Sequence, residues 1–171
     1  MSLPLPFVPM IKVLFVCLGN ICRSPTAQGV FEKLIAEAGL DDHIYVDSAG
    51  TSSYHVGESP DPRAQRAARK RGIDLSRQRS RQVVPGDCRE FDYILAMDRD
   101  NLRALRRTCP EARDRMHLFL DFAPHLGVRD VPDPYYGGSR GFEHVLDLIE
   151  EAGRGLLEHI KRHDLNGTDG G

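Results

Sequence analysis

The sequence has no apolar run long enough to cross a lipid bilayer. Its longest apolar stretch, Val8 to Leu18, is interrupted by Lys12 and falls short of the roughly 20 residues that a membrane-spanning helix needs. A basic start followed by an apolar segment and a small-residue cleavage site is also missing. We therefore expect no signal peptide and no membrane partner.

Cysteine is scarce, with four residues in a chain of 171. The four do not resemble a disulfide framework and form no Cys-x-x-Cys metal pair, which favours a reducing, cytoplasmic setting. Cys17 and Cys22 could bridge only in a redox event that distorts their loop. Among the seven histidines, His159 and His163 are four residues apart but have no acidic third ligand of obvious placement. We predict no metal and no cofactor.

The charge balance gives no global reason to expect nucleic acid as a partner, because the net charge is only −2. One segment, residues 63–81, holds eight basic residues and a single acid, Asp74. A nucleic-acid patch is one interpretation of it. A solvated helix face with structural arginines is the interpretation we favour, since no aromatic residues lie between the charges. Its charge would give at most a modest attraction for acidic phosphopeptides.

Hydrophobic periodicity predicts alternating strands and helices in one domain. Strands are expected at 11–17, 44–50, 93–97 and, at an edge, 116–119; helices are expected at 25–38, 64–71, 99–107 and 142–160. Right-handed crossovers would join the strands into a parallel sheet. The expected fold class is α/β, a three-layer sandwich with a central, mostly four-stranded parallel sheet and helices on both faces. We assign residues 1–10 to a loose leader, 11–163 to the domain and 164–171 to a flexible tail.

The segment from Cys17 to Arg23 joins the end of the first strand to the start of a helix. Backbone N–H groups and the positive end of the helix dipole meet there, so the loop is suited to bind an anion. In this setting Cys17 is expected to exist largely as the thiolate, and Arg23 can grip two oxygens of a tetrahedral oxyanion. The combination predicts covalent phosphoryl transfer without a metal. An ATP-binding loop is excluded because no Gly-Lys-Ser/Thr follows.

The same spacing recurs from Cys109 to Arg115, so spacing alone is weak evidence. There Glu111 and Asp114 would repel phosphate, Pro110 removes an N–H, and no strand leads in. The surrounding sequence therefore selects Cys17.

Four motifs in chain order resemble the low-molecular-weight protein tyrosine phosphatases. They are VCLGNICRSP at 16–25, DSAGT at 47–51, AMD at 96–98 and DPYYG at 133–137, and the resemblance extends from about residue 11 to 160. It implies a phosphatase that acts on phosphotyrosine-containing proteins or aryl phosphates and takes phosphate, sulfate or vanadate in its site. A cytoplasmic monomer or weak dimer is expected.

The resemblance also implies roles for individual residues. Cys17 would be the nucleophile and Asp133 the general acid and base. The oxygens of the phosphoryl group would be held by the Arg23 guanidinium and by the backbone amides of the loop, which are those of Leu18, Gly19, Asn20, Ile21, Cys22 and Arg23.

Supporting roles follow in the same way. Ser24 would stabilise the Cys17 sulfur as it leaves, and Asn20 would take a left-handed conformation held by Ser48. Cys22 would be a redox partner of Cys17; packing as a small residue behind the loop is its alternative. Tyr54, Tyr135 and Tyr136 would form the rim of the substrate site, and phosphorylation of the last two stays open. A simple Asp-Pro turn is the alternative for Asp133.

Two other functions compete with this one. An arsenate reductase would need further, closely spaced cysteines for a relay, and Cys88 and Cys109 are 21 residues apart in sequence, which argues against it. A non-catalytic phosphopeptide-binding module would be expected to lack the nucleophile or the acid, whereas Cys17 and Asp133 are both present.

Overall fold

The computed structural model describes residues 10–135 and 139–165, and its centre is a parallel sheet in the order β2-β1-β3-β4. The strands are β1 (Ile11–Cys17), β2 (Ile44–Gly50), β3 (Tyr93–Ala96) and β4 (Met116–Leu118). The α-helices are α1 (Arg23–Glu37), α2 (Pro62–Arg69), α3 (Pro85–Glu90), α4 (Arg99–Thr108) and α5 (Ser139–His163). Three short 3-10 helices span Pro110–Arg115, Phe119–Phe122 and Pro124–Leu126. The predicted four-stranded parallel α/β sandwich is confirmed.

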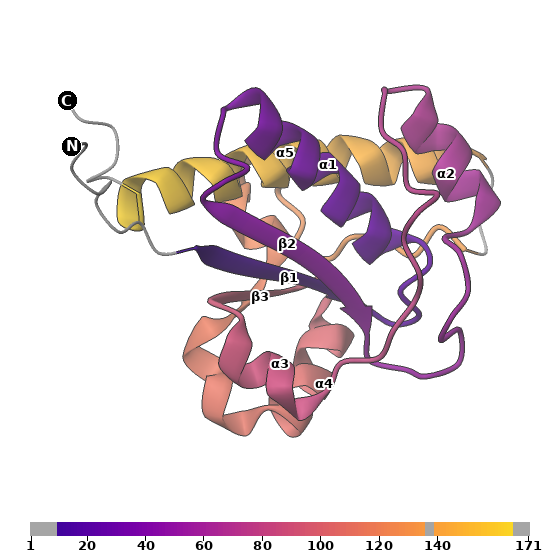
Figure 1. The fold of residues 1–171 in the computed structure, drawn as a ribbon. Coiled ribbons are helices and arrows are strands. Elements are labelled where there is room, and N and C mark those ends of the chain that lie inside the picture. Colours follow the sequence, from indigo (N-terminus) through magenta and orange to yellow (C-terminus); the bar gives the residue numbers. More distant parts are fainter. Residues whose placement is uncertain (1–9, 136–138, 166–171) are drawn as a thin grey trace, which may run out of the picture.

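Strand β1 is apolar except at Lys12 because both faces of the sheet are covered. Figure 1 shows α1, α2 and α5 on one face, and α3 and α4 on the other. Successive side chains of a strand point to opposite faces. Val13, Phe15 and Cys17 accordingly belong to the core beneath α1 and α5, and Leu14 and Val16 to the core beneath α3 and α4.

The last helix, α5, has 25 residues and begins at Ser139, earlier than its apolar periodicity predicts. Its buried side chains, among them Val145, Ile149 and Leu156, lie in the core shared with α1. The other side of α5 is polar. Within the part of the chain that the structure describes, no helix is both long and apolar enough to cross a membrane.

A disulfide that the sequence analysis does not predict joins Cys88 in α3 to Cys109, the residue that ends α4. The Cα atoms are 5.6 Å apart, and both residues are buried. The prediction that the four cysteines form no disulfide framework is therefore wrong for this pair. Helices α3 and α4 cover the same face of the sheet, which brings the two together. Cys17 lies in the other core and is a free thiol, as is Cys22.

Candidate active site

The site lies where β1 ends, between the ends of β2 and β3. The chain runs from β1 to β2 on one side and returns to β3 on the other, and ligands of α/β proteins bind at such a switch point. Cys17 is the last residue of β1 and is paired in register with Gly50. A Cβ atom on Gly50 would lie 2.7 Å from the Leu18 carbonyl oxygen, so only glycine allows the loop to pass this close.

A cavity of about 410 Å³ opens at this point. It is lined by Cys17, Leu18, Gly19, Ile21, Cys22, Arg23, Ser52, Tyr54, His55, Asp133 and Tyr135. The structure thus gathers side chains from three separate parts of the sequence, including the predicted nucleophile, arginine and acid. Among the described residues, no group of three or more His, Cys, Asp or Glu side chains is placed to hold a metal ion.

The Cys17 sulfur lies among hydrogen-bond donors. Its Sγ is 3.0 Å from the Ser24 hydroxyl oxygen and accepts a 3.3 Å hydrogen bond from the Asn20 backbone N–H. Cys17 is only 3% exposed, and its carbonyl oxygen accepts from the Thr51 N–H. These contacts stabilise negative charge on the sulfur, which favours its role as a nucleophile or a leaving group.

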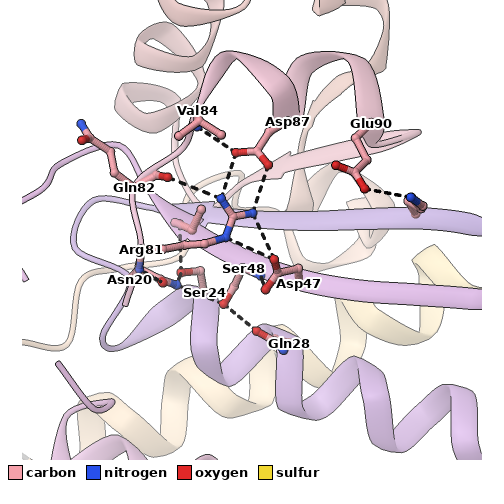
Figure 2. Close-up of polar contacts among 12 residues, drawn as sticks. Asn20, Ser24, Gln28, Asp47, Ser48, Arg81, Gln82, Val84, Asp87 and Glu90 are labelled. Carbon is pink, nitrogen blue, oxygen red and sulfur yellow. Dashed lines mark hydrogen bonds and ion pairs between the residues drawn. The ribbon is translucent and has the colours of Figure 1, made fainter. Parts of the chain in front are cut away.

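Asn20 shapes the loop from beneath and does not line the cavity. Its φ of 55° is the only positive value at a non-glycine residue in the described chain. Its Nδ2 donates to the hydroxyls of Ser24 at 2.7 Å and Ser48 at 3.0 Å, and its Oδ1 accepts from the Arg81 backbone N–H at 3.0 Å. Figure 2 shows this network. The three hydrogen bonds of the Asn20 side-chain amide stabilise the left-handed backbone conformation that the tight turn of the loop requires.

Arg23 is 4% exposed, and its guanidinium is fixed by groups from two other elements. Nη1 donates to Asp98 Oδ2 at 2.6 Å and to the Val131 carbonyl oxygen at 2.9 Å. Burial alone would lower the pKa of Arg23, but the Cys17 sulfur and the Asp98 carboxylate outweigh it and raise this pKa above its ordinary value. The guanidinium therefore stays charged while buried, and its orientation is set before any anion arrives.

Asp133 lies across the cavity from the loop, on the segment that follows Val131. Its Oδ2 is 3.8 Å from Arg23 Nη2, and its Oδ1 accepts from the Tyr135 N–H at 3.0 Å. The side chain is 39% exposed. The turn geometry considered as an alternative for Asp133 is thus present, and the carboxylate still faces the cavity. A group in this place can exchange a proton with a bound molecule.

Cys22 is buried beside the same loop, and burial raises the pKa of its thiol well above the ordinary range. Cys22 therefore stays protonated at neutral pH.

Aromatic side chains form the rim of the cavity. Tyr54 is 84% exposed, its ring contacts that of His55 edge-on at 4.7 Å, and the His55 ring lies 6.4 Å from the Tyr135 ring. Arg63 lies over the Tyr135 ring at 5.4 Å. Tyr136, the third predicted rim residue, lies outside the described residues.

Sequence reasoning missed three side chains of this site. His55 lines the cavity and pairs with Glu58; its position beside Tyr54 in a Ser-, Gly- and Pro-rich loop was the available signal. Ser52 also lines the cavity, and nothing in the sequence distinguishes it from its neighbours. Asp98 is the last residue of the AMD motif; it caps α4 through Asn101, and its other oxygen holds Arg23.

The comparisons with known proteins agree with one another. The family model described as low molecular weight phosphotyrosine protein phosphatase matches residues 12–166. A putative low molecular weight protein-tyrosine-phosphatase of Synechocystis is 49% identical over 91% of this chain and 99% of its own.

Solved structures give the same result. A protein tyrosine phosphatase of Entamoeba histolytica, with Hepes in the active site, is 42% identical with a TM-score of 0.86, covering 89% of this chain and 97% of its own. Wzb of Vibrio vulnificus in complex with benzylphosphonate is 33% identical with a TM-score of 0.78, covering 88% and 99%. The chain belongs to the low molecular weight phosphotyrosine protein phosphatase family.

Proposed function

We propose that this protein is a metal-independent tyrosine phosphatase that hydrolyses phosphotyrosine and small aryl phosphates through a phosphocysteine intermediate. One observation carries the proposal: Cys17, Arg23 and Asp133 line a single cavity. They supply a nucleophile, a bidentate anion clamp and a proton carrier, which together suffice for both steps of phosphate monoester hydrolysis.

In the first step the Cys17 thiolate attacks phosphorus opposite the phenolic oxygen. The S–P bond forms as the P–O bond to the aryl group breaks. The Asp133 carboxyl group gives its proton to the departing phenolate oxygen. The Arg23 guanidinium and the loop amides hold the three remaining oxygens, whose charge is best stabilised at the transition state.

In the second step water attacks phosphorus while the S–P bond breaks. The Asp133 carboxylate takes a proton from the water, so the acid of the first step is the base of the second. The Ser24 hydroxyl, 3.0 Å from the sulfur, donates to the thiolate as it leaves. Inorganic phosphate is released and the enzyme returns to its starting state.

The preference for aryl phosphates follows from the leaving group. Phenolate has a pKa near 10 and is expelled far more easily than an aliphatic alkoxide, so a single carboxylic acid suffices. Tyr54 and Tyr135, on the rim, would flank an aromatic substrate. The names of two relatives' structures, which mention Hepes and benzylphosphonate, support a site for phosphate-like anions. We expect phosphate, sulfate and vanadate to bind here.

Three further expectations belong to this proposal. After a peroxide-type oxidant converts the Cys17 thiol to a sulfenic acid, the Cys22 thiol would attack the Cys17 sulfur, and the hydroxyl group would leave as water to give a reversible disulfide. The protein is expected in the cytoplasm. It is expected to be a monomer or weak dimer.

The test is hydrolysis of para-nitrophenyl phosphate at mildly acidic pH with EDTA present. Cys17→Ser should abolish the activity, and Asp133→Ala should reduce it strongly. Asp130→Ala is the matched control, because it removes a carboxylate from the same segment that pairs with Arg99 instead. Activity that survives in Cys17→Ser would overturn the assigned nucleophile. Arsenate-dependent thiol oxidation without phosphatase activity would favour the reductase.

A further inference from the structure

Arg81 lies beneath the phosphate-binding loop and joins three elements. Its guanidinium donates a bidentate pair of hydrogen bonds to Asp87 of α3, from Nη1 at 3.0 Å and from Nη2 at 3.1 Å. On its other side it reaches Asp47 of β2, with Nε and Nη2 at 3.2 Å and 3.1 Å from Oδ2. Figure 2 shows the guanidinium between the two carboxylates. The guanidinium nitrogens of Arg81 thus all donate to partners within the fold.

The backbone of the same residue contacts the loop and the sheet. The Arg81 N–H donates to Asn20 Oδ1 at 3.0 Å, and its carbonyl oxygen accepts from the Gly50 N–H at 2.8 Å. Asn20 is the left-handed residue of the loop, and its own N–H points at the Cys17 sulfur. A shift of the Arg81 backbone would therefore be passed to Asn20 and, through it, to the amides that face the cavity.

We propose that Arg81 is a positioning residue for the phosphate-binding loop: its guanidinium anchors residue 81 to β2 and α3, so that its backbone holds Asn20 in place. The inference rests on the proposed function, because the loop is taken as the phosphate site. Arg81 does not line the cavity. It acts on the chemistry only by fixing where the loop amides point.

Asp87, the partner of Arg81 on α3, is itself held in place. Asp87 is 5% exposed, and its Oδ2 also accepts from the Val84 N–H at 2.8 Å at the start of α3. Loss of the guanidinium would leave this carboxylate buried without its counter-charge, so α3 and the residue 81 backbone would both have to rearrange. A lysine cannot replace the fork, since one ammonium group cannot match both oxygens of Asp87 and reach Asp47.

The chain offers a matched control in Arg71. It lies within the same basic segment and also bridges several carboxylates: Glu143 at 2.7 Å, Asp147 at 3.0 Å and Glu150 at 3.2 Å, all on α5. These partners connect α2 to α5 and include no residue of the loop. Arg71→Ala thus removes an ion-pair network of similar size without disturbing the phosphate site.

The experiment compares Arg81→Ala, Arg81→Lys and Arg71→Ala with the unchanged protein. It measures kcat and KM on para-nitrophenyl phosphate, calorimetric binding of inorganic phosphate, and the Tm. We expect kcat/KM of Arg81→Ala to fall about ten- to hundredfold, the effect of misplacing reacting groups by a fraction of an ångström to an ångström. Phosphate affinity should fall with it. Arg71→Ala should lower the Tm but change kcat/KM by less than about twofold.

Two results would overturn the inference. One is a folded Arg81→Ala variant with kcat/KM and phosphate affinity close to those of the unchanged protein. The other is full rescue by Arg81→Lys, which would show that charge alone, and not the fork, is required. If Arg81→Ala fails to fold, Asp87→Asn is measured instead, because it weakens the same ion pair more mildly. A fall in kcat/KM and in phosphate affinity is again expected, and values close to those of the wild type would overturn the inference. If the wild-type protein neither hydrolyses the ester nor binds phosphate, the proposed function itself is refuted.

Discussion

Asp98→Asn is predicted to impair catalysis although the residue does not line the cavity. In the structure one oxygen of Asp98 caps α4 through the Asn101 N–H at 2.7 Å, and the other accepts from Arg23 at 2.6 Å. Asparagine keeps the shape and can keep the cap. It removes the charge that neutralises a guanidinium that is 4% exposed, so Arg23 is free to turn toward Asp133, 3.8 Å away.

The magnitude follows from the contact that is lost. A hydrogen bond between charged groups contributes about 1.5–3 kcal/mol, and at about 1.36 kcal/mol per tenfold this corresponds to about a 10- to 150-fold loss in kcat/KM. Steady-state hydrolysis of para-nitrophenyl phosphate measures it, and thermal unfolding shows whether the cap survives. Asp98→Ala should match Asp98→Asn in activity and be less stable by about 1 kcal/mol, the worth of a helix cap. A kcat/KM for Asp98→Asn within about twofold of the unchanged protein, a factor expected for an incidental surface change, would refute this reasoning.

Three other predictions follow from the same structure. Ser24→Ala should lower kcat about tenfold or more, because the Cys17 sulfur loses a hydrogen-bond donor at 3.0 Å. Slower breakdown of the phosphocysteine should then produce a burst of para-nitrophenol in stopped-flow measurements. Absence of the burst would show that this breakdown is not slowed. Reduction of the Cys88–Cys109 disulfide should lower the free energy of unfolding in urea by about 3 kcal/mol, from the chain entropy of a 21-residue separation. A Cys88→Ala/Cys109→Ala variant should not respond to the reductant, and an equal response would refute this assignment. At neutral pH iodoacetate should label Cys17 before Cys22, because burial raises the Cys22 pKa and keeps it protonated; peptide mass spectrometry decides, and prior labelling of Cys22 would contradict it.

Sequence patterns predicted the parts of the fold that bury a continuous apolar face. Strand β1 was recognised as a short apolar, β-branched run, and helices α1 and α5 were recognised because their apolar residues recur at helical spacing. Helix α3 was not, since its six residues, PGDCRE, carry no such period. Because α3 was not predicted, the disulfide between Cys88 and Cys109 was not predicted either, since it depends on how α3 packs against the end of α4.

The candidate site was predictable where function requires a residue type at a fixed spacing. Cys17 and Arg23 lie on one loop with five residues between them, and Asp133 belongs to a recognisable motif. The supporting contacts were not predictable in this way. Asp98 reaches Arg23 only because β3 lies next to β1 in the sheet. Arg81 was one of eight basic residues in its segment, and only its carboxylate partners on β2 and α3 set it apart.

The most direct test of the account is to identify the phosphorylated residue during turnover. The protein is mixed with para-nitrophenyl phosphate, denatured by acid within the first turnover, and digested for mass spectrometry. A phosphocysteine mechanism predicts one phosphoryl group on the sulfur of Cys17 and none in the Cys17→Ser variant. A phosphoryl group on any other residue, or full turnover with no phosphorylated cysteine at any quench time, would contradict it.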